Sequence, residues 1–262
     1  MKRARVGQRA LAAAALVVLA GCATVPAGGS VGAPNDPWES WNRKVYSFND
    51  AIDQAVLKPV ATAYRDVVPA FLRTGVDNVL GNLYDVWSTA NHFLQGKVRS
   101  GMEMGMRVLT NTVLGAGGFM DPATEMGLTR RSEDFGQTLG VWGVAQGPFV
   151  VLPLLGPSTL RDTAGLLLDR QAAPSTLPDQ ASGRYTVTAL ELINTRANLL
   201  SAGALVDQVA LDRYAFIRDA YLSRRRDALY DGAPPMDTFA DEPDDAKAPA
   251  AAAPKPAASA PR

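Results

Sequence analysis

The sequence predicts an all-α protein that folds as a single helical domain. Apolar residues recur at steps of three and four through most of the chain between residues 36 and 232, which is the period of an amphipathic helix. No clear run alternates strictly between apolar and polar residues, as a half-buried strand would. About 200 residues lie in this region, which is enough chain for one sizeable core.

The first 21 residues are predicted to be a secretory signal peptide. Four basic residues precede an uninterrupted apolar run at 10–20, which is too short for a stable membrane span. The run ends in Leu19-Ala20-Gly21-Cys22, which resembles the lipobox of bacterial lipoproteins, where cleavage precedes the cysteine and its thiol is acylated. The alternative is an ordinary signal peptide followed by a buried cysteine. We favour acylation because Cys22 is the only cysteine and lies at the expected cleavage point.

Lipidation predicts where the protein is held. A diacylglycerol and an amide-linked acyl chain on Cys22 would form a long-lived anchor, since two chains hold a protein at a membrane where one does so only marginally. Residue 23 is Ala and not Asp, which favours sorting to the outer membrane. With a single cysteine, the mature chain has no intrachain disulfide.

Composition separates the domain from its two ends. Residues 22–35 are mostly small and read as a lipidated tether, whereas 233–262 hold eleven Ala and seven Pro and are predicted to be disordered. The helical domain is therefore expected at 36–232. Removing the four basic signal-peptide residues leaves 22 basic and 26 acidic side chains, a net charge of −4 that does not suggest a nucleic-acid partner.

The first helix is expected to begin with Asp36 as its cap and Pro37 in its first turn, and to end at Pro59. One apolar stripe runs along it, made of Trp38, Trp41, Val45, Phe48, Ile52 and Val56. Further helices are predicted over 69–96, 102–113, 158–168, 186–200 and 214–222. Ser158 is expected to cap the helix at 158–168. We interpret each stripe as a face that packs into the core.

An uncharged run at 135–160 is long enough to cross a bilayer but contains Pro148, Pro153, Pro157 and several glycines. Two interior prolines with neighbouring glycines cost a helix about 6 to 8 kcal/mol. Transfer of the large apolar residues of this run into the membrane would contribute only about 5 kcal/mol in favour of a span. The balance weighs against one spanning helix without excluding a kinked one. Two readings remain: a buried loop with a short helix, or irregular backbone that faces a cavity or lipid.

The sequence shows no assembled catalytic or metal-binding motif, so a binding or transport protein is expected rather than an enzyme. The one histidine, His92, is expected to be a packed or surface residue. Glu133 and Asp134 could act as paired acids, but beside Arg130 and Arg131 they suggest a solvated charged loop. No metal or soluble cofactor is predicted.

Three long segments are distinctive: NDPWESWNRKVYSFND at 35–50, LTNTVLGAGGFMDPAT at 109–124, and EDFGQTLGVWGVAQGPFVVLPLLGPSTLRDTAG at 133–165. The most specific strings within them are NTVLGAGGFMD and FGQTLGVWGVAQGPFVVLPLLGPSTLRD. These segments resemble the MlaA/VacJ family of outer-membrane phospholipid-transport lipoproteins. The resemblance covers nearly all of residues 35–230. It implies a ring- or disc-like helical domain in the inner leaflet of the outer membrane, on the periplasmic side, with a central amphipathic channel for phospholipid. It also implies association with a trimeric porin and delivery to a soluble periplasmic carrier similar to MlaC.

The resemblance and the residue pattern together give the expected lipid path and membrane rim. Trp38, Trp41 and Phe48 would lie on the rim, where indole rings suit the membrane interface. The expected path consists of Gly143, Gly147, Pro148, Phe149, Leu152, Leu154, Arg161 and Asp162. The last two, with Asp169, either contact headgroups or are capping charges on the surface. Two other functions remain: a structural envelope lipoprotein with no channel and, less consistent with the motifs, a peptidoglycan hydrolase.

Overall fold

The computed structural model describes residues 35–235, and the chain there is mostly helical. The signal peptide, Cys22, the tether up to residue 34 and the tail from residue 236 lie outside the described residues. The elements follow in the order α2 (Glu39–Ile52), a π-helical turn (Asp53–Leu57), α3 (Lys58–Val67), α4 (Ala70–Leu94), α5 (Val98–Val113), α6 (Pro122–Glu125), α7 (Phe135–Val141), β1 (Phe149–Leu152), β2 (Gly156–Thr159), α8 (Leu160–Asp169), a 3₁₀ turn (Pro174–Thr176), α9 (Ala181–Asn198), α10 (Leu200–Val209) and α11 (Arg213–Leu229).

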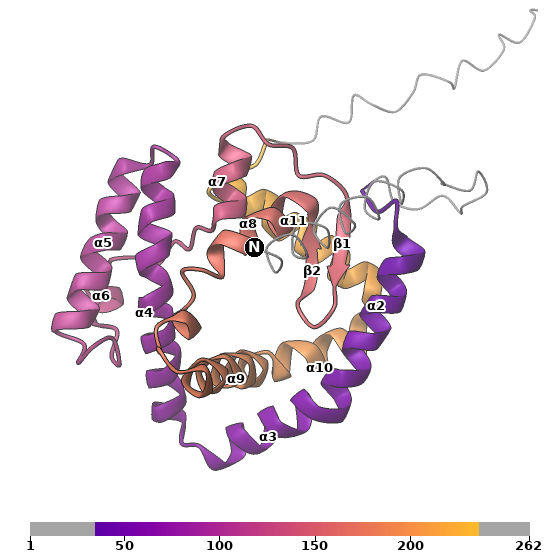
Figure 1. Cartoon of the computed structure of the whole chain (residues 1–262), viewed down its shortest axis with the longest axis horizontal. Coiled ribbons are helices and arrows are strands. Elements are labelled where there is room, and N and C mark those ends of the chain that lie inside the picture. Colours follow the sequence, from indigo (N-terminus) through magenta and orange to yellow (C-terminus); the bar gives the residue numbers. More distant parts are fainter. Residues whose placement is uncertain (1–34, 236–262) are drawn as a thin grey trace, which may run out of the picture.

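The helices are arranged as a frame (Figure 1). α2, α3 and α4 form three sides of it, α9 and α10 lie along the inner side of α3, and α5 packs on the outer side of α4. The fourth side consists of α7, α8, α11 and the β1–β2 hairpin. The hairpin tip points into the middle of the frame, where it is surrounded by segments that are far apart in sequence.

The prediction of an all-α fold is wrong in one segment. Residues 149–159 form an antiparallel hairpin in which Phe149 pairs with Thr159 and Leu152 with Gly156. The three-residue turn between them contains Leu154, whose φ of 64° is in the left-handed region that few side chains adopt. The rest of the uncharged run is α7 and a loop, as expected for a segment with this many prolines and glycines. Within residues 35–235, no helix is both long and apolar enough to cross a membrane.

Three predicted helix boundaries differ from expectation. Pro59 does not end the first helix, since the π-helical turn shifts the hydrogen-bond register and places the proline in the first turn of α3. Asp36 does not cap α2 and is instead buried, accepting hydrogen bonds from Asn42 at 2.8 Å and from Tyr214. The cap of α8 is Thr159, which accepts from the Asp162 N–H, and not Ser158.

Polar residues, and not the predicted stripes, fill much of the interior. Of the buried side chains in residues 35–235 other than glycine and proline, eighteen are polar or charged and nine are apolar. α4 buries Asn82, Asp85, Ser88, Asn91 and His92, while α5 buries Arg107 and Asn111. Nearly all of these side chains have hydrogen-bond partners, as buried polar groups require; His92, for example, lies 3.0 Å from the Arg131 carbonyl.

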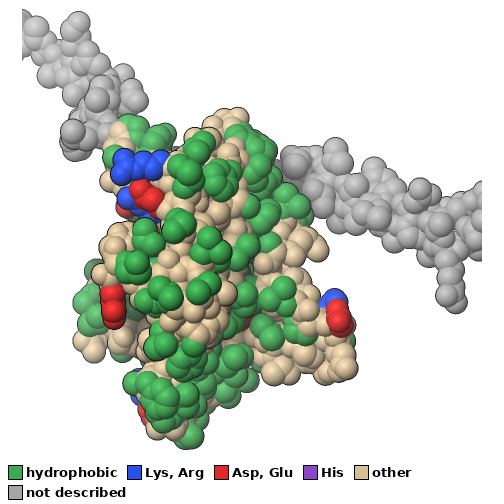
Figure 2. All heavy atoms as spheres, turned by 90° about the vertical axis from the view of Figure 1, so that its left-hand side faces the viewer, with side chains coloured by type: hydrophobic (Ala, Val, Ile, Leu, Met, Phe, Trp, Pro, Cys, Tyr) green, Lys and Arg blue, Asp and Glu red, His purple; other side chains and the backbone are tan. Residues whose placement is uncertain are grey.

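The apolar stripes largely face outward. Trp41 and Phe48 of α2 are 60% and 53% exposed, and on α5 the residues Met102, Met106, Leu109 and Val113 are also exposed. Figure 2 shows many hydrophobic side chains spread over the face on the α5 side, with few charges among them. The interpretation of every stripe as core packing is therefore wrong. A small apolar core does exist between α2, β1 and α11, formed by Val45, Phe149, Val151 and Tyr214.

Candidate functional site

The hairpin is held in the frame by two asparagines of α2. Asn42 donates to the Phe149 carbonyl at 3.1 Å and accepts from the Val151 N–H at 2.9 Å. Asn49 donates to the Leu152 carbonyl at 2.9 Å and accepts from the Leu154 N–H at 2.8 Å. These amides satisfy the backbone edge of β1 that β2 leaves unpaired.

Three adjoining cavities lie between the hairpin and the end of α11. The hairpin cavity, of about 200 Å³, is lined at one end by the apolar residues Leu152, Leu155 and Pro157. The central cavity, of about 580 Å³, lies between α4, α8 and α11, and it shares the wall residues Leu166 and Tyr221 with the hairpin cavity. The mouth cavity, of about 530 Å³, lies at the end of α11 and shares Gln137 and other residues with the central cavity.

The polarity of the walls changes along this series. One end of the hairpin cavity is lined by Leu152, Leu155 and Pro157. The mouth cavity is lined mainly by charged and amide side chains: Arg131, Glu133, Gln137, Arg224, Asp227 and Asp231. On the other side of the hairpin lies a separate, mostly apolar cavity of about 370 Å³, bordered by Phe149 and Val151. The hairpin therefore forms a wall between two cavities.

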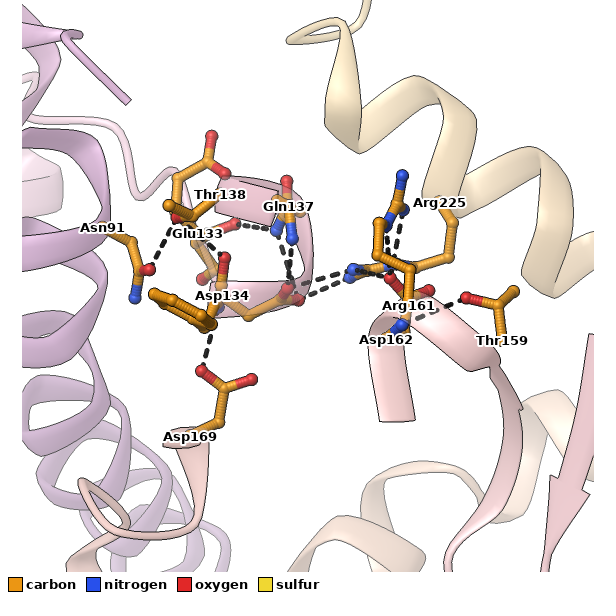
Figure 3. Close-up of polar contacts among 12 residues, drawn as sticks. Asn91, Glu133, Asp134, Gln137, Thr138, Thr159, Arg161, Asp162, Asp169 and Arg225 are labelled. Atoms are coloured by element: carbon orange, nitrogen blue, oxygen red, sulfur yellow. Dashed lines mark hydrogen bonds and ion pairs between the residues drawn. The ribbon is translucent and has the colours of Figure 1, made fainter. Parts of the chain in front are cut away.

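Paired charged side chains form a belt at the hairpin and central cavities, both of which Asp134 and Arg225 line. Figure 3 shows the polar contacts among these side chains. The Arg225 guanidinium binds Asp134 Oδ1 at 3.0 Å and Asp162 Oδ1 at 2.9 Å. Arg161 also binds Asp162 Oδ1, at 3.0 Å, and Tyr221 donates to Asp162 Oδ2 at 2.9 Å. The belt joins α7, α8 and α11, so that these elements depend on one another for charge compensation.

The pKa values in the belt follow from burial opposed by pairing. Burial disfavours the ionised Asp162 carboxyl, but the charge and hydrogen bonds of Arg225 outweigh it and lower the Asp162 pKa. Asp134 behaves in the same way, its pKa being lowered mainly by Arg225 against the effect of burial. Burial raises the pKa of Asp169. Its carboxylate accepts hydrogen bonds from the neutral donors Trp87 Nε1 at 2.7 Å and the Phe135 N–H at 2.9 Å, and these do not outweigh the effect of burial.

The structure places some predicted path residues at these cavities. Leu152 and Asp162 line the hairpin cavity, and Phe149 lines the apolar cavity beyond it. Arg161 is buried in the belt and lines none of the cavities described here. Asp162 and Arg161 are not surface capping charges, which removes that alternative.

Other predicted path residues are not in the walls of these cavities. Gly143, Gly147 and Pro148 belong to the loop that precedes β1, the two glycines having φ values of 90° and 69°. Leu154 is 64% exposed at the hairpin tip. These four residues line none of the cavities described here, and their part in a lipid path stays a prediction. Trp38, which immediately precedes α2, is exposed like Trp41 and Phe48 of that helix.

Sequence reasoning missed several wall residues. Glu133 and Asp134 are not a solvated loop, since Glu133 is buried against Lys97 at 2.9 Å and Asp134 binds Arg225. Arg224 and Arg225 belong to an arginine run at 224–226 near the end of a predicted helix, where the helix dipole alone would explain positive charges. Leu166 and Tyr221 gave no signal beyond their apolar stripes. Within residues 35–235 there is no cluster of side chains suited to a metal ion.

Comparison with known proteins decides the family. A family model described as MlaA lipoprotein matches residues 34–228. The chain belongs to the MlaA lipoprotein family. It is 40% identical over 214 residues to the intermembrane phospholipid transport system lipoprotein MlaA of Escherichia coli K12, covering 79% of this chain and 82% of that protein. The Haemophilus influenzae protein of the same name is 30% identical over 221 residues, covering 82% and 88%.

A solved structure agrees with the MlaA assignment. It was reported as the structural basis for maintenance of bacterial outer membrane lipid asymmetry, and one of its chains is 38% identical to this one with a TM-score of 0.64. The similarity covers 74% of this chain and 98% of that chain. The resemblance inferred from the sequence segments is thereby confirmed. Membership of a transport lipoprotein family also supports the expectation that the chain is not an enzyme.

Proposed function

We propose that this MlaA-family chain removes mislocalised phospholipids from the outer leaflet of the outer membrane and passes them toward the periplasm. Its relatives are lipoproteins of the intermembrane phospholipid transport system. The structural relative was reported in connection with outer-membrane lipid asymmetry. The chain is thus an outer-membrane lipoprotein whose activity is transport without covalent change to the lipid.

The inverted polarity of the frame is the observation that carries the proposal. In a protein surrounded by water, exposed apolar stripes would cost free energy at roughly 25 cal/mol per Å². Here such stripes cover α2 and α5, while amides and charged groups are buried. Large exposed apolar surfaces mark contact with a membrane or another protein. A frame whose rim lies among acyl chains, with polar groups turned inward, accounts for both features.

The lipid path of the proposal follows the adjoining cavities. Acyl chains would lie against Leu152, Leu155 and Leu166, and the headgroup would pass the charged belt toward the mouth cavity. Because Arg225 is already paired with Asp134 and Asp162, the belt offers a polar surface without a free charge that would trap a phosphate. Transport requires binding that is favourable enough to admit the ligand and weak enough to release it.

The anchor and the partners complete the proposal. A diacylglycerol and an acyl chain on Cys22 would hold the protein at the inner leaflet of the outer membrane. The tether ends at Asn35, whose carbonyl accepts a hydrogen bond from the Phe149 N–H at 2.8 Å, so the anchored end joins the domain beside the hairpin. A trimeric porin beside the apolar rim and a soluble MlaC-like carrier below the mouth cavity would supply and receive the lipid.

Replacement of Leu152 by Asp tests the path. A charge in the hairpin cavity should obstruct acyl chains, so phospholipid should accumulate in the outer leaflet although the protein remains anchored at normal levels. Leaflet composition can be measured by outer-leaflet labelling of phospholipid amines in intact cells. Leu154→Asp is the matched comparison: it changes the same residue type two positions away at an exposed site. An equal effect of both variants would place Leu154 on the path as well.

Unchanged outer-leaflet phospholipid in Leu152→Asp cells would instead support the alternative function, a structural envelope lipoprotein with no lipid path. Complete deletion of the protein provides the upper limit for accumulation. Circular dichroism of the purified variant in detergent shows whether the fold is intact, because a loss of folded protein would produce accumulation for a different reason.

A further inference from the structure

Two charged side chains near the end of α11 have no partner among residues 35–235. The exposed Arg224 lines both the central and the mouth cavity, and no hydrogen bond or ion pair engages its guanidinium. Asp227 lines the mouth cavity and its carboxylate is also unpaired. Residues three apart share one face of a helix, yet these two opposite charges do not form an ion pair with each other. Arg225 differs sharply, being held by two aspartates.

The position of Asp227 is unfavourable for helix stability. It lies in the last turn of α11, where the partial negative charge of the helix end disfavours a carboxylate. Within residues 35–235 no ion pair compensates the Asp227 carboxylate directly, and the basic residue of that turn, Arg226, donates to the Pro235 carbonyl. An unpaired charge that is locally destabilising and lines a cavity is better explained by a ligand than by the fold.

A third polar group faces the same place. Gln137 is 3% exposed and lines both the central and the mouth cavity. Its amide nitrogen binds the Ser132 carbonyl at 3.3 Å, but its side-chain oxygen Oε1 accepts no hydrogen bond. A buried acceptor without a donor is rare in folded proteins, and it indicates a missing partner that carries N–H or O–H groups.

We propose that Arg224, Asp227 and Gln137 form a subsite for a zwitterionic phosphoethanolamine headgroup. The Arg224 guanidinium binds the phosphate, for which its geometry and charge are suited. Asp227 and the Gln137 Oε1 atom accept hydrogen bonds from the ammonium group, which has three donors. A phosphatidylglycerol headgroup has the phosphate without the cation, so Asp227 opposes its binding. This subsite rests on the proposed transport function and specifies the lipid class that it favours.

The test uses the purified full-length lipoprotein in detergent with an equimolar mixture of phosphatidylethanolamine and phosphatidylglycerol that have identical acyl chains. Native mass spectrometry gives the amount of each lipid bound. The wild-type protein should favour phosphatidylethanolamine by about two- to fivefold, the range expected for one partly exposed ion pair. Asp227→Asn should bring the ratio close to one, and Arg224→Gln should lower binding of both lipids by a similar factor.

Two control variants change the same residue types away from the subsite. Asp179→Asn and Arg65→Gln alter residues that line none of the cavities described here, Arg65 lying on α3 beside Asp66, and both should retain the wild-type ratio. Equal binding of the two lipids by wild-type protein, or an unchanged ratio in Asp227→Asn, would overturn the subsite. If the wild-type protein binds the two lipids equally but Leu152→Asp still abolishes lipid binding, the headgroup inference is wrong and the proposed transport path is retained.

Discussion

Asn42 and Asn49 of α2 bind the same free edge of β1, at points separated by two helical turns. Each side-chain amide donates to one carbonyl of β1, and it accepts from a backbone N–H, that of Val151 in the strand for Asn42 and that of Leu154 in the turn for Asn49, at distances between 2.8 and 3.1 Å. The spacing of seven residues places both amides on one face of the helix. The helix thereby takes the place of a third strand and fixes the wall that separates the apolar cavity from the hairpin cavity.

Removal of these amides should have unequal effects. Asn42 is fully buried and also binds Asp36, so Asn42→Ala leaves several buried polar groups unpaired and should lower the free energy of unfolding by about 2 to 4 kcal/mol. Asn49→Ala should cost about 1 kcal/mol and mainly loosen the tip around Leu154. Thermal unfolding in detergent measures the first effect, and hydrogen exchange of the hairpin amides measures the second. Equal destabilisation by both variants would contradict this account.

Two aspartates of α8 should respond oppositely to neutralisation. Asp162→Asn removes the counter-ion shared by Arg161 and Arg225 and should destabilise the protein by about 2 to 3 kcal/mol at pH 7. Asp169→Asn keeps the Oδ1 acceptor that Trp87 and Phe135 use and removes a charge that burial disfavours. The Asp169 variant should therefore match or exceed wild-type stability at pH 7. Denaturant unfolding of both variants provides the comparison.

The pH dependence of these differences follows from the direction of each pKa shift. The folded-state pKa of Asp162 is lowered, so its stabilisation is present above the unfolded value of about 3.9 and is lost as pH falls through the lower folded value. The deficit of Asp162→Asn should therefore persist from pH 7 down to about 4 and shrink below it. The pKa of Asp169 is raised, so any gain in Asp169→Asn should disappear as pH falls toward 3.9. A deficit of Asp162→Asn that shrinks already between pH 7 and 5 would argue against a lowered pKa.

On α5, where apolar side chains are exposed and polar side chains are buried, we predict different effects of two substitutions. Leu109→Ser changes an exposed apolar side chain and should leave stability in detergent within about 0.5 kcal/mol of wild type, while weakening partition of the protein into lipid vesicles. Asn111→Leu conserves side-chain size but removes hydrogen bonds to Asp121 at 2.9 Å and from the Ala123 N–H at 3.0 Å. It should cost about 2 to 4 kcal/mol. In a protein with an apolar interior, the order of the two effects would be reversed.

Cys22 can be tested by fractionation of cell envelopes. Cys22→Ala should leave the signal peptide uncleaved and keep the protein out of the outer membrane, because no thiol is available for acylation. Ala23→Asp is the companion variant, since it keeps the thiol and should instead retain the acylated protein at the inner membrane. Normal placement of the Cys22 variant in the outer membrane would refute the anchor.

The sequence predicted helix positions better than it predicted which face of each helix is buried. The stripes of α4 and α5 were visible because spacing alone reveals them, and both helices lie close to their expected ranges. The spacing of apolar residues does not show whether a stripe faces the protein core, lipid or a partner protein. The rule that apolar faces pack inward assumes water outside, and it fails when the rim contacts acyl chains or a partner protein.

Sequence patterns could not predict the hairpin or the belt. β1 has only four residues, and all of them are apolar. Phe149 and Val151 face one side of the strand and Leu152 faces the other, but an all-apolar sequence shows no alternation from which this could be predicted. The belt joins Asp134, Asp162 and Arg225, which lie up to 91 residues apart in sequence. Such pairs depend on how α7, α8 and α11 meet, which periodicity does not determine.

A photo-crosslinking residue in place of Leu166 tests the central claim most directly, because this position borders both the hairpin and the central cavity. A second variant with the same probe at the exposed Leu109 controls for crosslinking chemistry with lipid. After irradiation of intact cells, mass spectrometry of the purified protein should show intact phospholipid attached at residue 166, and the adduct should disappear when Leu152→Asp is added. Phospholipid adducts at residue 109 with none at residue 166 would contradict a lipid path through the frame.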